Sequence, residues 1–183
     1  MNEKNETFNP EHNPNGAEGA LDTNKLPWIE ISEVQGLSIK PIRVSPESGM
    51  FSLIFKLQKG ASFPSSIYLG GMDLLVLSGQ LGYIQNDQES ILAPGTWGFI
   101  SANSRVGKIV AHEDSEVLGN FYSGVAFLRK DGSLKSILTG ADILAMSEEN
   151  NISLVPNSLT ECWEREPEKY EGPGEPLAIA SLN

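Results

Sequence analysis

The chain has 183 residues, of which 24 are acidic and 13 basic, giving a formal net charge of −11. This length suits one domain with a buried core. The acidic balance argues against a nucleic-acid partner, because phosphate binding relies on clustered Lys and Arg. The one cysteine excludes a disulfide framework, and no apolar run approaches the roughly 18 residues that span a bilayer. We therefore expect a cytoplasmic protein that does not associate with membranes.

The first segment, residues 1–24, is rich in Asn, Pro and Gly, and its only large apolar residues are Met1, Phe8 and Leu21. Such a segment cannot bury enough surface to offset the entropy of ordering it. We expect a disordered leader, or an arm that orders on a partner.

Residues 25–140 have a different pattern, in which short apolar runs alternate with turn residues. Alternation with the period of a half-buried strand sets Phe51, Leu53, Phe55 and Leu57 against Ser52, Ile54, Lys56 and Gln58. Many short strands with turns between them predict an all-β sandwich or barrel. The expected strands are 26–32, 37–44, 50–57, 66–69, 73–77, 81–85, 90–92, 97–100, 108–111, 116–122 and 125–129.

Residues 141–183 are expected to form a short helical segment and a tail. The stretch 141–149 favours a helix, and a capping box at 158–161 starts a second one that Pro167 ends. One face of this second helix carries Leu159, Cys162 and Trp163. We expect both helices to pack on the barrel or on another subunit.

Two segments carry a family resemblance. GASFPSSIYLGGMDLLVLSG at 60–79 and SILAPGTWGFI at 90–100 resemble the two motifs of the cupin family. With the flanking segments, residues 26–146 are similar to the cupin subgroup of acetylacetone-cleaving and dihydroxyacetophenone-cleaving dioxygenases and anti-sigma-factor cupin domains. The resemblance implies a single jelly-roll barrel, the double-stranded β-helix, with short C-terminal helices.

The metal-ligand positions depart from the cupin motif, which places two histidines, a glutamate and a third histidine around a metal. Counted from Gly79 and from the Pro-Gly turn, these positions fall on Ser66, Tyr68, Met72 and Val106. None offers the imidazole or carboxylate that a divalent metal prefers. The chain has only two histidines. We therefore expect no metal and no cofactor.

Tyr68 and His112 are the candidate catalytic residues. The family turns position 68 inward, so Tyr68 would present a phenol to the pocket. If the strand after Val106 is regular, alternation brings His112 to the same cavity. The pair would then supply one group that gives a proton and one that takes it. In the alternative, His112 is solvated in the polar hairpin 112–115.

Further side chains are candidates for binding a substrate, either because they stand at former ligand positions or because they are aromatic or basic residues on predicted strands. They are Ser66, Met72, Tyr83, Trp97, Phe99, Val106, Lys56, Arg43 and Tyr122. In the alternative, the rings only fill the barrel, and Lys56 and Arg43 are exposed.

Three functions follow as hypotheses. The first is a metal-free enzyme that uses acid/base chemistry to catalyse the isomerisation, cyclisation or elimination of a small apolar carbonyl compound. The second is a degenerate, non-catalytic cupin that binds or senses a small molecule, with a metal-dependent dioxygenase relative as a further alternative. The third is a filled structural domain. Because exposed strand edges favour pairing, we also expect a homodimer, formed through Leu26–Ser32 or the face of the second helix.

Overall fold

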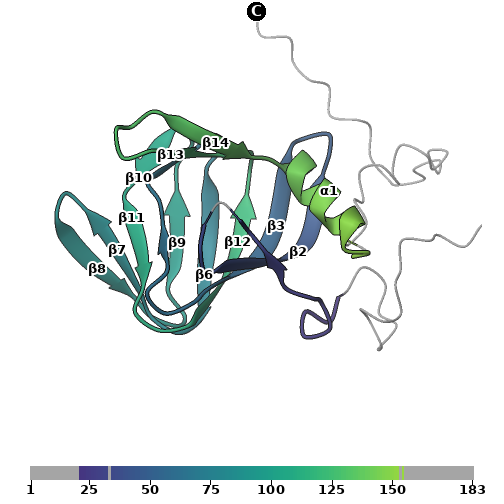
Figure 1. The fold of residues 1–183 in the computed structure, drawn as a ribbon, viewed down its shortest axis with the longest axis horizontal. Helices are drawn as coiled ribbons and strands as arrows, with labels where there is room; N and C mark the ends of the chain where they lie inside the picture. The colour runs from purple at the N-terminus through teal and green to yellow at the C-terminus, as the bar shows by residue number, and fades with distance from the viewer. Residues whose placement is uncertain (1–20, 33, 153, 155–183) are drawn as a thin grey trace, which may run out of the picture.

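The computed structural model describes residues 21–32, 34–152 and 154. In this part of the chain the strands form three antiparallel sheets and are followed by one helix (Figure 1). The elements are β1 Ile29–Glu30, β2 Leu37–Ser45, β3 Met50–Leu57, β4 Ser62–Phe63, β5 Ser66–Tyr68, β6 Met72–Ser78, β7 Leu81–Gln85, β8 Gln88–Leu92, β9 Trp97–Ile100, β10 Ser104–Val106, β11 Lys108–Ala111, β12 Ser115–Phe121, β13 Val125–Leu128, β14 Leu134–Leu138 and α1 Gly140–Glu149.

The largest sheet has six strands in the order β1-β2-β3-β12-β6-β9. The other two sheets have four strands each, in the orders β10-β5-β13-β14 and β4-β11-β7-β8. Some neighbouring strands, such as β3 and β12, come from distant parts of the chain, and this connectivity is typical of a jelly roll. The expected all-β barrel is confirmed.

The core lies between the sheets and follows strand alternation. On β12, Ser115, Val117, Gly119 and Phe121 are buried, and the residues between them are half-buried. Phe121 stacks on Phe51 with ring centroids 4.6 Å apart. Burying each such ring contributes about 1.5–3 kcal/mol, so these aromatic contacts help to hold the sheets together.

The helix α1 packs against β2 and β3, at one end of the large sheet (Figure 1). Thr139 caps its N-terminus: its hydroxyl accepts from the Asp142 N–H, and the Asp142 carboxylate accepts from the Thr139 backbone N–H over 2.8 Å. Ile143 is fully buried against the barrel. The helix expected at 141–149 is confirmed, whereas the one expected from 158 lies outside the described residues.

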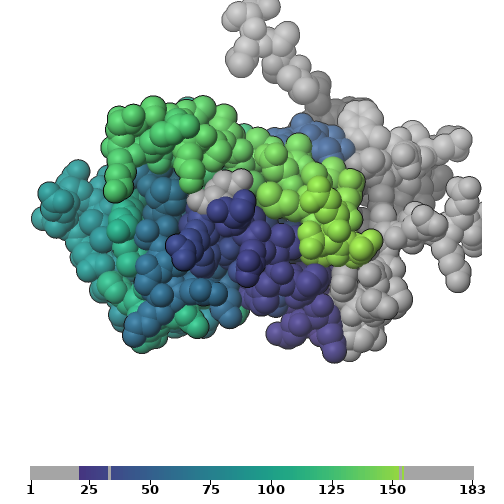
Figure 2. Space-filling view, viewed as in Figure 1, coloured from purple at the N-terminus to yellow at the C-terminus, as the bar shows by residue number. Residues whose placement is uncertain are grey.

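The segment 21–32, drawn in purple, lies across the front of the molecule in Figure 2. Lys40 Nζ donates to the Thr23 carbonyl over 2.8 Å and lies 4.4 Å from the centroid of the Trp28 ring. The strand expected at 26–32 is shorter in the structure, because only Ile29–Glu30 pair with β2. The helix α1 is too short to cross a membrane, and it is the one helix among the described residues.

Candidate functional site

A small cavity of about 10 Å³ lies inside the barrel, between the large sheet and the strands facing it. This volume is close to the least that holds one water molecule. Apart from one phenol, the lining is apolar. The lining residues are Phe55, Leu57, Phe63, Tyr68, Met72, Leu74, Ile109 and Phe121.

The four former ligand positions all point into the barrel. Relative exposure is 1% for Ser66, 2% for Tyr68, 1% for Met72 and 4% for Val106. Val106 stands opposite Ser66 in the antiparallel pair of β10 and β5. The expected inward face of these strands is therefore correct, since Leu74 and Val76 are buried with them.

These four side chains do not fit a metal. They offer an alcohol, a phenol, a thioether and an isopropyl group, and the Ser66 hydroxyl already donates to the Pro64 carbonyl over 2.8 Å. Divalent metals in proteins prefer neutral imidazole, carboxylate or thiolate. No group of three or more His, Cys, Asp or Glu side chains able to hold a metal occurs within the described part of the chain.

Tyr68 is the polar group of this cavity. Its ring stacks near Phe121 at a centroid distance of 6.1 Å. Burial raises the pKa of Tyr68, and Tyr83 adds a smaller contribution in the same direction. Its hydroxyl forms no hydrogen bond with any residue that the structure describes. Among the described residues, the fully buried side-chain polar atom without a hydrogen-bond partner is Ser136 Oγ, so the Tyr68 hydroxyl is not completely enclosed by the protein.

His112 does not share the cavity with Tyr68, which corrects the expected pair. Val106 is buried at the end of β10, but Ile109 and Ala111 are the buried residues of β11. Gly107 separates the two strands and shifts the alternation by one position, so Val110 and His112 do not share the inward face of Val106.

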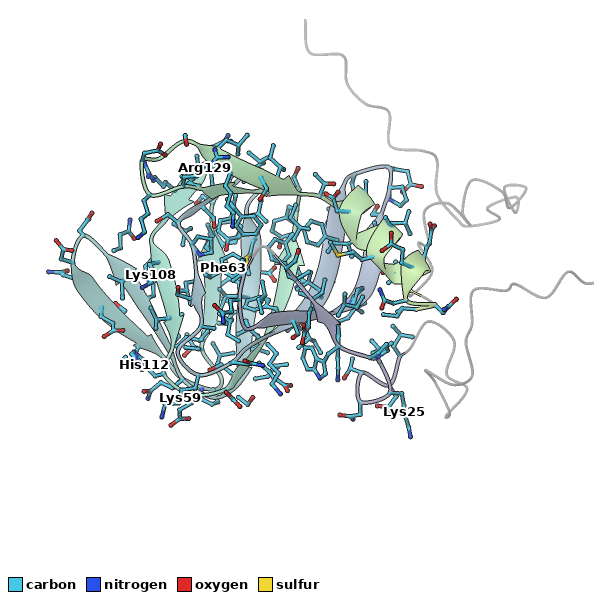
Figure 3. The ribbon with its side chains drawn as sticks, viewed as in Figure 1. Lys25, Lys59, Phe63, Lys108, His112 and Arg129 are labelled. Carbon is cyan, nitrogen blue, oxygen red and sulfur yellow. The ribbon has the colours of Figure 1, made fainter. Side chains whose placement is uncertain are left out.

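The His112 side chain is instead 38% exposed, with Nε2 2.8 Å from Glu89 Oε1. Figure 3 shows Phe63 within the barrel and His112 at its lower margin near Lys59. The alternative of a surface histidine is therefore the one the structure supports.

Two of the candidate aromatic residues face outward. Trp97 and Phe99 are 64% and 57% exposed, on the outer face of β9. They stand opposite Leu75 and Asp73 on β6, which alternate with the buried Met72, Leu74 and Val76. The structure therefore places neither ring in the cavity.

The remaining candidates do not line the cavity, although Tyr83 stands opposite the lining residue Ile109 in the pair of β11 and β7. Tyr83 is half-buried against the core and donates to Gln85 Oε1, and Tyr122 donates to Asp73 Oδ2 on the outside of the large sheet. Lys56 lies 5.7 Å from the centroid of the Trp28 ring, and Arg43 is exposed.

Several lining residues were not among the candidates from the sequence. Leu57 and Phe121 could have been found, because they follow the alternation of β3 and β12. Phe63 belongs to a strand of two residues, too short to show a pattern. Ile109 was missed through the shift at Gly107.

Known proteins are similar to this chain in sequence and in fold. The family model of the ChrR cupin-like domain matches residues 17–123. The acetylacetone-cleaving enzyme of Acinetobacter johnsonii is 26% identical over 116 residues, which cover 62% of this chain and 75% of that protein.

Solved structures agree on the fold. The acetylacetone dioxygenase from Acinetobacter johnsonii superposes with a TM-score of 0.61 at 20% identity, covering 67% of this chain and 85% of that one. An RmlC-like cupin from Ralstonia eutropha superposes with a TM-score of 0.64 at 16% identity, covering 74% and 90%. Because the family model matches more than half of the chain, this chain belongs to the ChrR cupin-like family of the cupin superfamily.

Proposed function

We propose that this cupin binds a small, mainly apolar molecule inside its barrel and catalyses no reaction on it, with Tyr68 donating the hydrogen bond that orients the ligand. The observation that carries the proposal is Tyr68, a buried residue whose hydroxyl has no hydrogen-bond partner among the described residues and which lines an otherwise apolar cavity. Small-molecule sites in proteins have this composition, a mostly apolar lining with a few polar groups.

Acid/base catalysis receives less support from the same geometry. A proton transfer needs a second group within about 3 Å of the reacting atom, or one water away. His112 contacts Glu89 on the surface, and the other lining residues of the cavity are hydrocarbon or thioether side chains. The geometry therefore supports ligand binding better than it supports a metal-free enzyme.

The chemistry of the relatives suggests the class of ligand. One relative is named for cleaving acetylacetone, a small diketone whose carbonyl oxygens accept hydrogen bonds. A carbonyl oxygen suits the Tyr68 hydroxyl, and the rest of such a molecule suits the apolar lining. Because the cavity is only about 10 Å³, a ligand enters by displacing a side chain. Met72 is the flexible candidate, since methionine adapts its shape readily.

A second candidate is a filled barrel that acts only through its surface. The small cavity volume favours it, together with the stacked rings of Phe51 and Phe121 that occupy the interior. The two candidates differ in whether any small molecule reaches Tyr68.

A titration with acetylacetone separates them. Calorimetry and methyl chemical shifts would follow binding to the full chain, with Tyr68→Phe as the test and Tyr83→Phe as the matched control. Loss of one hydrogen bond corresponds to about 2- to 10-fold weaker binding for Tyr68→Phe. Tyr83→Phe should bind as the wild type does, because the Tyr83 hydroxyl donates to Gln85 and Tyr83 does not line the cavity.

The other outcomes are equally decisive. Saturating concentrations with no shift at any cavity residue would favour the filled barrel. Release of cleavage products that stops in Tyr68→Phe but not in Tyr83→Phe would show catalysis and overturn the proposal.

A further inference from the structure

The edge strands of the three sheets differ in how they are protected from pairing. Each sheet ends in two edge strands, and β1 and β4 have only two residues each. Three other edge strands each carry a charged side chain: Glu89 on β8, Arg105 on β10 and Lys135 on β14. Short length and charge are the usual devices that prevent edge-to-edge pairing. The four residues of β9, Trp-Gly-Phe-Ile, have neither.

The backbone of β9 is oriented for pairing on its open side. The Val76 N–H donates to the Thr96 carbonyl over 3.0 Å, which fixes the bonded positions of the ladder between β6 and β9. Because antiparallel ladders bond at alternate residues, Gly98 and Ile100 face β6. Trp97 and Phe99 therefore direct their N–H and C=O groups to the open side, where no strand of the described residues pairs with them.

The side chains of β9 add apolar surface beside this edge. Trp97 and Phe99 are 64% and 57% exposed on the outer face of the large sheet. On the adjacent β6, Leu77 is 42% exposed on the same outer face, and Leu75 is half-buried. An apolar surface of this kind at a strand edge is characteristic of an interaction site.

We propose that β9 pairs antiparallel with β9 of a second copy of this chain, joining the two six-stranded sheets into one continuous sheet. A two-fold axis beside Gly98 sets Trp97 of one copy opposite Phe99 of the other. These are the residues whose backbone groups face outward, so each pair exchanges two N–H···O bonds. The two glycines meet at the position where antiparallel chains approach most closely.

Aromatic cross-strand pairs add to these hydrogen bonds. With this register Trp97 and Phe99 of the two copies share the outer face, and the two-fold axis repeats the pair. Such pairs contribute beyond the surface they bury, in edge-to-face or offset-stacked arrangements. The strand thus supplies both halves of its own interface, as a two-fold dimer requires.

Charge supports a second copy as the occupant. The chain carries a net charge of −11, so two copies repel wherever acidic surfaces meet. The residues of β9 carry no charge, and neither do Thr96 and Ser101 on either side. By contrast, Leu26 and Ile31, in the segment first expected to form the dimer, are 3% and 5% exposed and belong to the chain's own core.

The test is the mass of the full chain in solution. Sedimentation equilibrium at micromolar concentration should give twice the chain mass, and Trp97→Lys and Phe99→Lys should each weaken the dimer by about 30-fold or more, as aromatic hot spots do. The matched control is Ile91→Lys, because Ile91 is 51% exposed on the edge strand β8 and should leave the dimer intact.

Hydrogen exchange provides a second measurement that does not depend on the stability of a variant. The Trp97 and Phe99 amides of the wild-type chain should exchange slowly at high concentration and faster on dilution. A monomer at micromolar concentration overturns the proposal, as does a dimer that both lysine variants preserve. Capture of a different protein by a monomeric chain through this edge also overturns it. Because Trp97 and Phe99 are exposed on the outer face of the large sheet, these results are independent of ligand binding at Tyr68.

Discussion

The Tyr122 hydroxyl donates a hydrogen bond to Asp73 Oδ2 over 2.5 Å, joining the end of β12 to β6 on the outer face of the large sheet. Asn120 Nδ2 donates to the other carboxylate oxygen over 2.7 Å, and its own Oδ1 accepts from the Ser52 hydroxyl over 2.8 Å. The hydrogen bond to Asp73 is the main cause that raises the pKa of Tyr122. This polar network crosses three strands and adjoins Phe99, the ladder partner of Asp73.

Removing either end of this hydrogen bond should destabilise the fold, and the two changes should not be additive. Tyr122→Phe and Asp73→Ala are each expected to lower the urea midpoint, and the double variant should lose less than the sum, because both single changes remove the hydrogen bond between Tyr122 and Asp73. Chemical denaturation of the four proteins measures the coupling. Additive losses would show that the two side chains do not interact in solution.

Stability should fall at alkaline pH, and Tyr68 should contribute to the fall. Burial raises its pKa above the ordinary value of 10.0 in the folded chain. The unfolded chain therefore loses this proton first, and the stabilisation present below about pH 10 is lost as the pH rises towards the folded pKa. Urea midpoints between pH 8 and 11.5 should decline less steeply for Tyr68→Phe than for the wild type.

Tyr83→Phe is a graded comparison, because Tyr83 makes the smaller contribution to the raised pKa of Tyr68 and its loss should flatten the decline less than Tyr68→Phe does. Parallel declines for the wild type and Tyr68→Phe would mean that Tyr68 titrates alike in both states.

Alternation and turns in the sequence were enough to predict most of the barrel. The bounds of β3, β7, β9 and β11 agree with the expected segments 50–57, 81–85, 97–100 and 108–111. The inward positions 66, 68 and 72 also agree, because strand parity in this region is uninterrupted on either side of the Gly70-Gly71 turn. Alternation of apolar and polar residues with period two indicates which face of a strand is buried.

Breaks in that pattern explain what could not be predicted. A Cβ on Gly107 would lie 2.0 Å from the Ile84 carbonyl oxygen, so the backbone approaches β7 closely there and the alternation shifts. Glycine within a strand pattern is the signal of such an irregularity. The strand β14 was missed because its residues are mostly exposed and half-buried, which leaves no buried face in the sequence.

Tyr68→Phe should keep or increase the stability of the unliganded protein. The hydroxyl lacks a hydrogen-bond partner among the described residues, so removing it breaks no hydrogen bond while the ring and its contact with Phe121 stay. The expected change in the free energy of unfolding is a gain of about 0–1 kcal/mol at pH 7. Urea denaturation measures it, and a loss above about 1 kcal/mol would mean that the hydroxyl has a strong partner in the folded chain.

The purified full chain should hold far less than one transition-metal ion. The inward positions Ser66, Tyr68, Met72 and Val106 supply no imidazole or carboxylate, whereas a divalent metal requires such ligands at about 2.0–2.2 Å. Elemental analysis for Fe, Zn, Mn and Ni tests this after growth with each metal. Metal that disappears in His112→Ala would belong to the surface pair with Glu89 and leave the conclusion intact.

Restoring the ligands provides the converse experiment. Because the four positions face one interior, a chain with Ser66→His, Tyr68→His, Met72→Glu and Val106→His together should bind Co²⁺ in about equimolar amount, visible as d–d absorption that the wild type lacks. One Fe, Zn, Mn or Ni per wild-type chain, released by Tyr68→Phe and retained by His112→Ala, would contradict the assignment. The barrel would then hold metal through ligands of a kind that the cupin motif does not use.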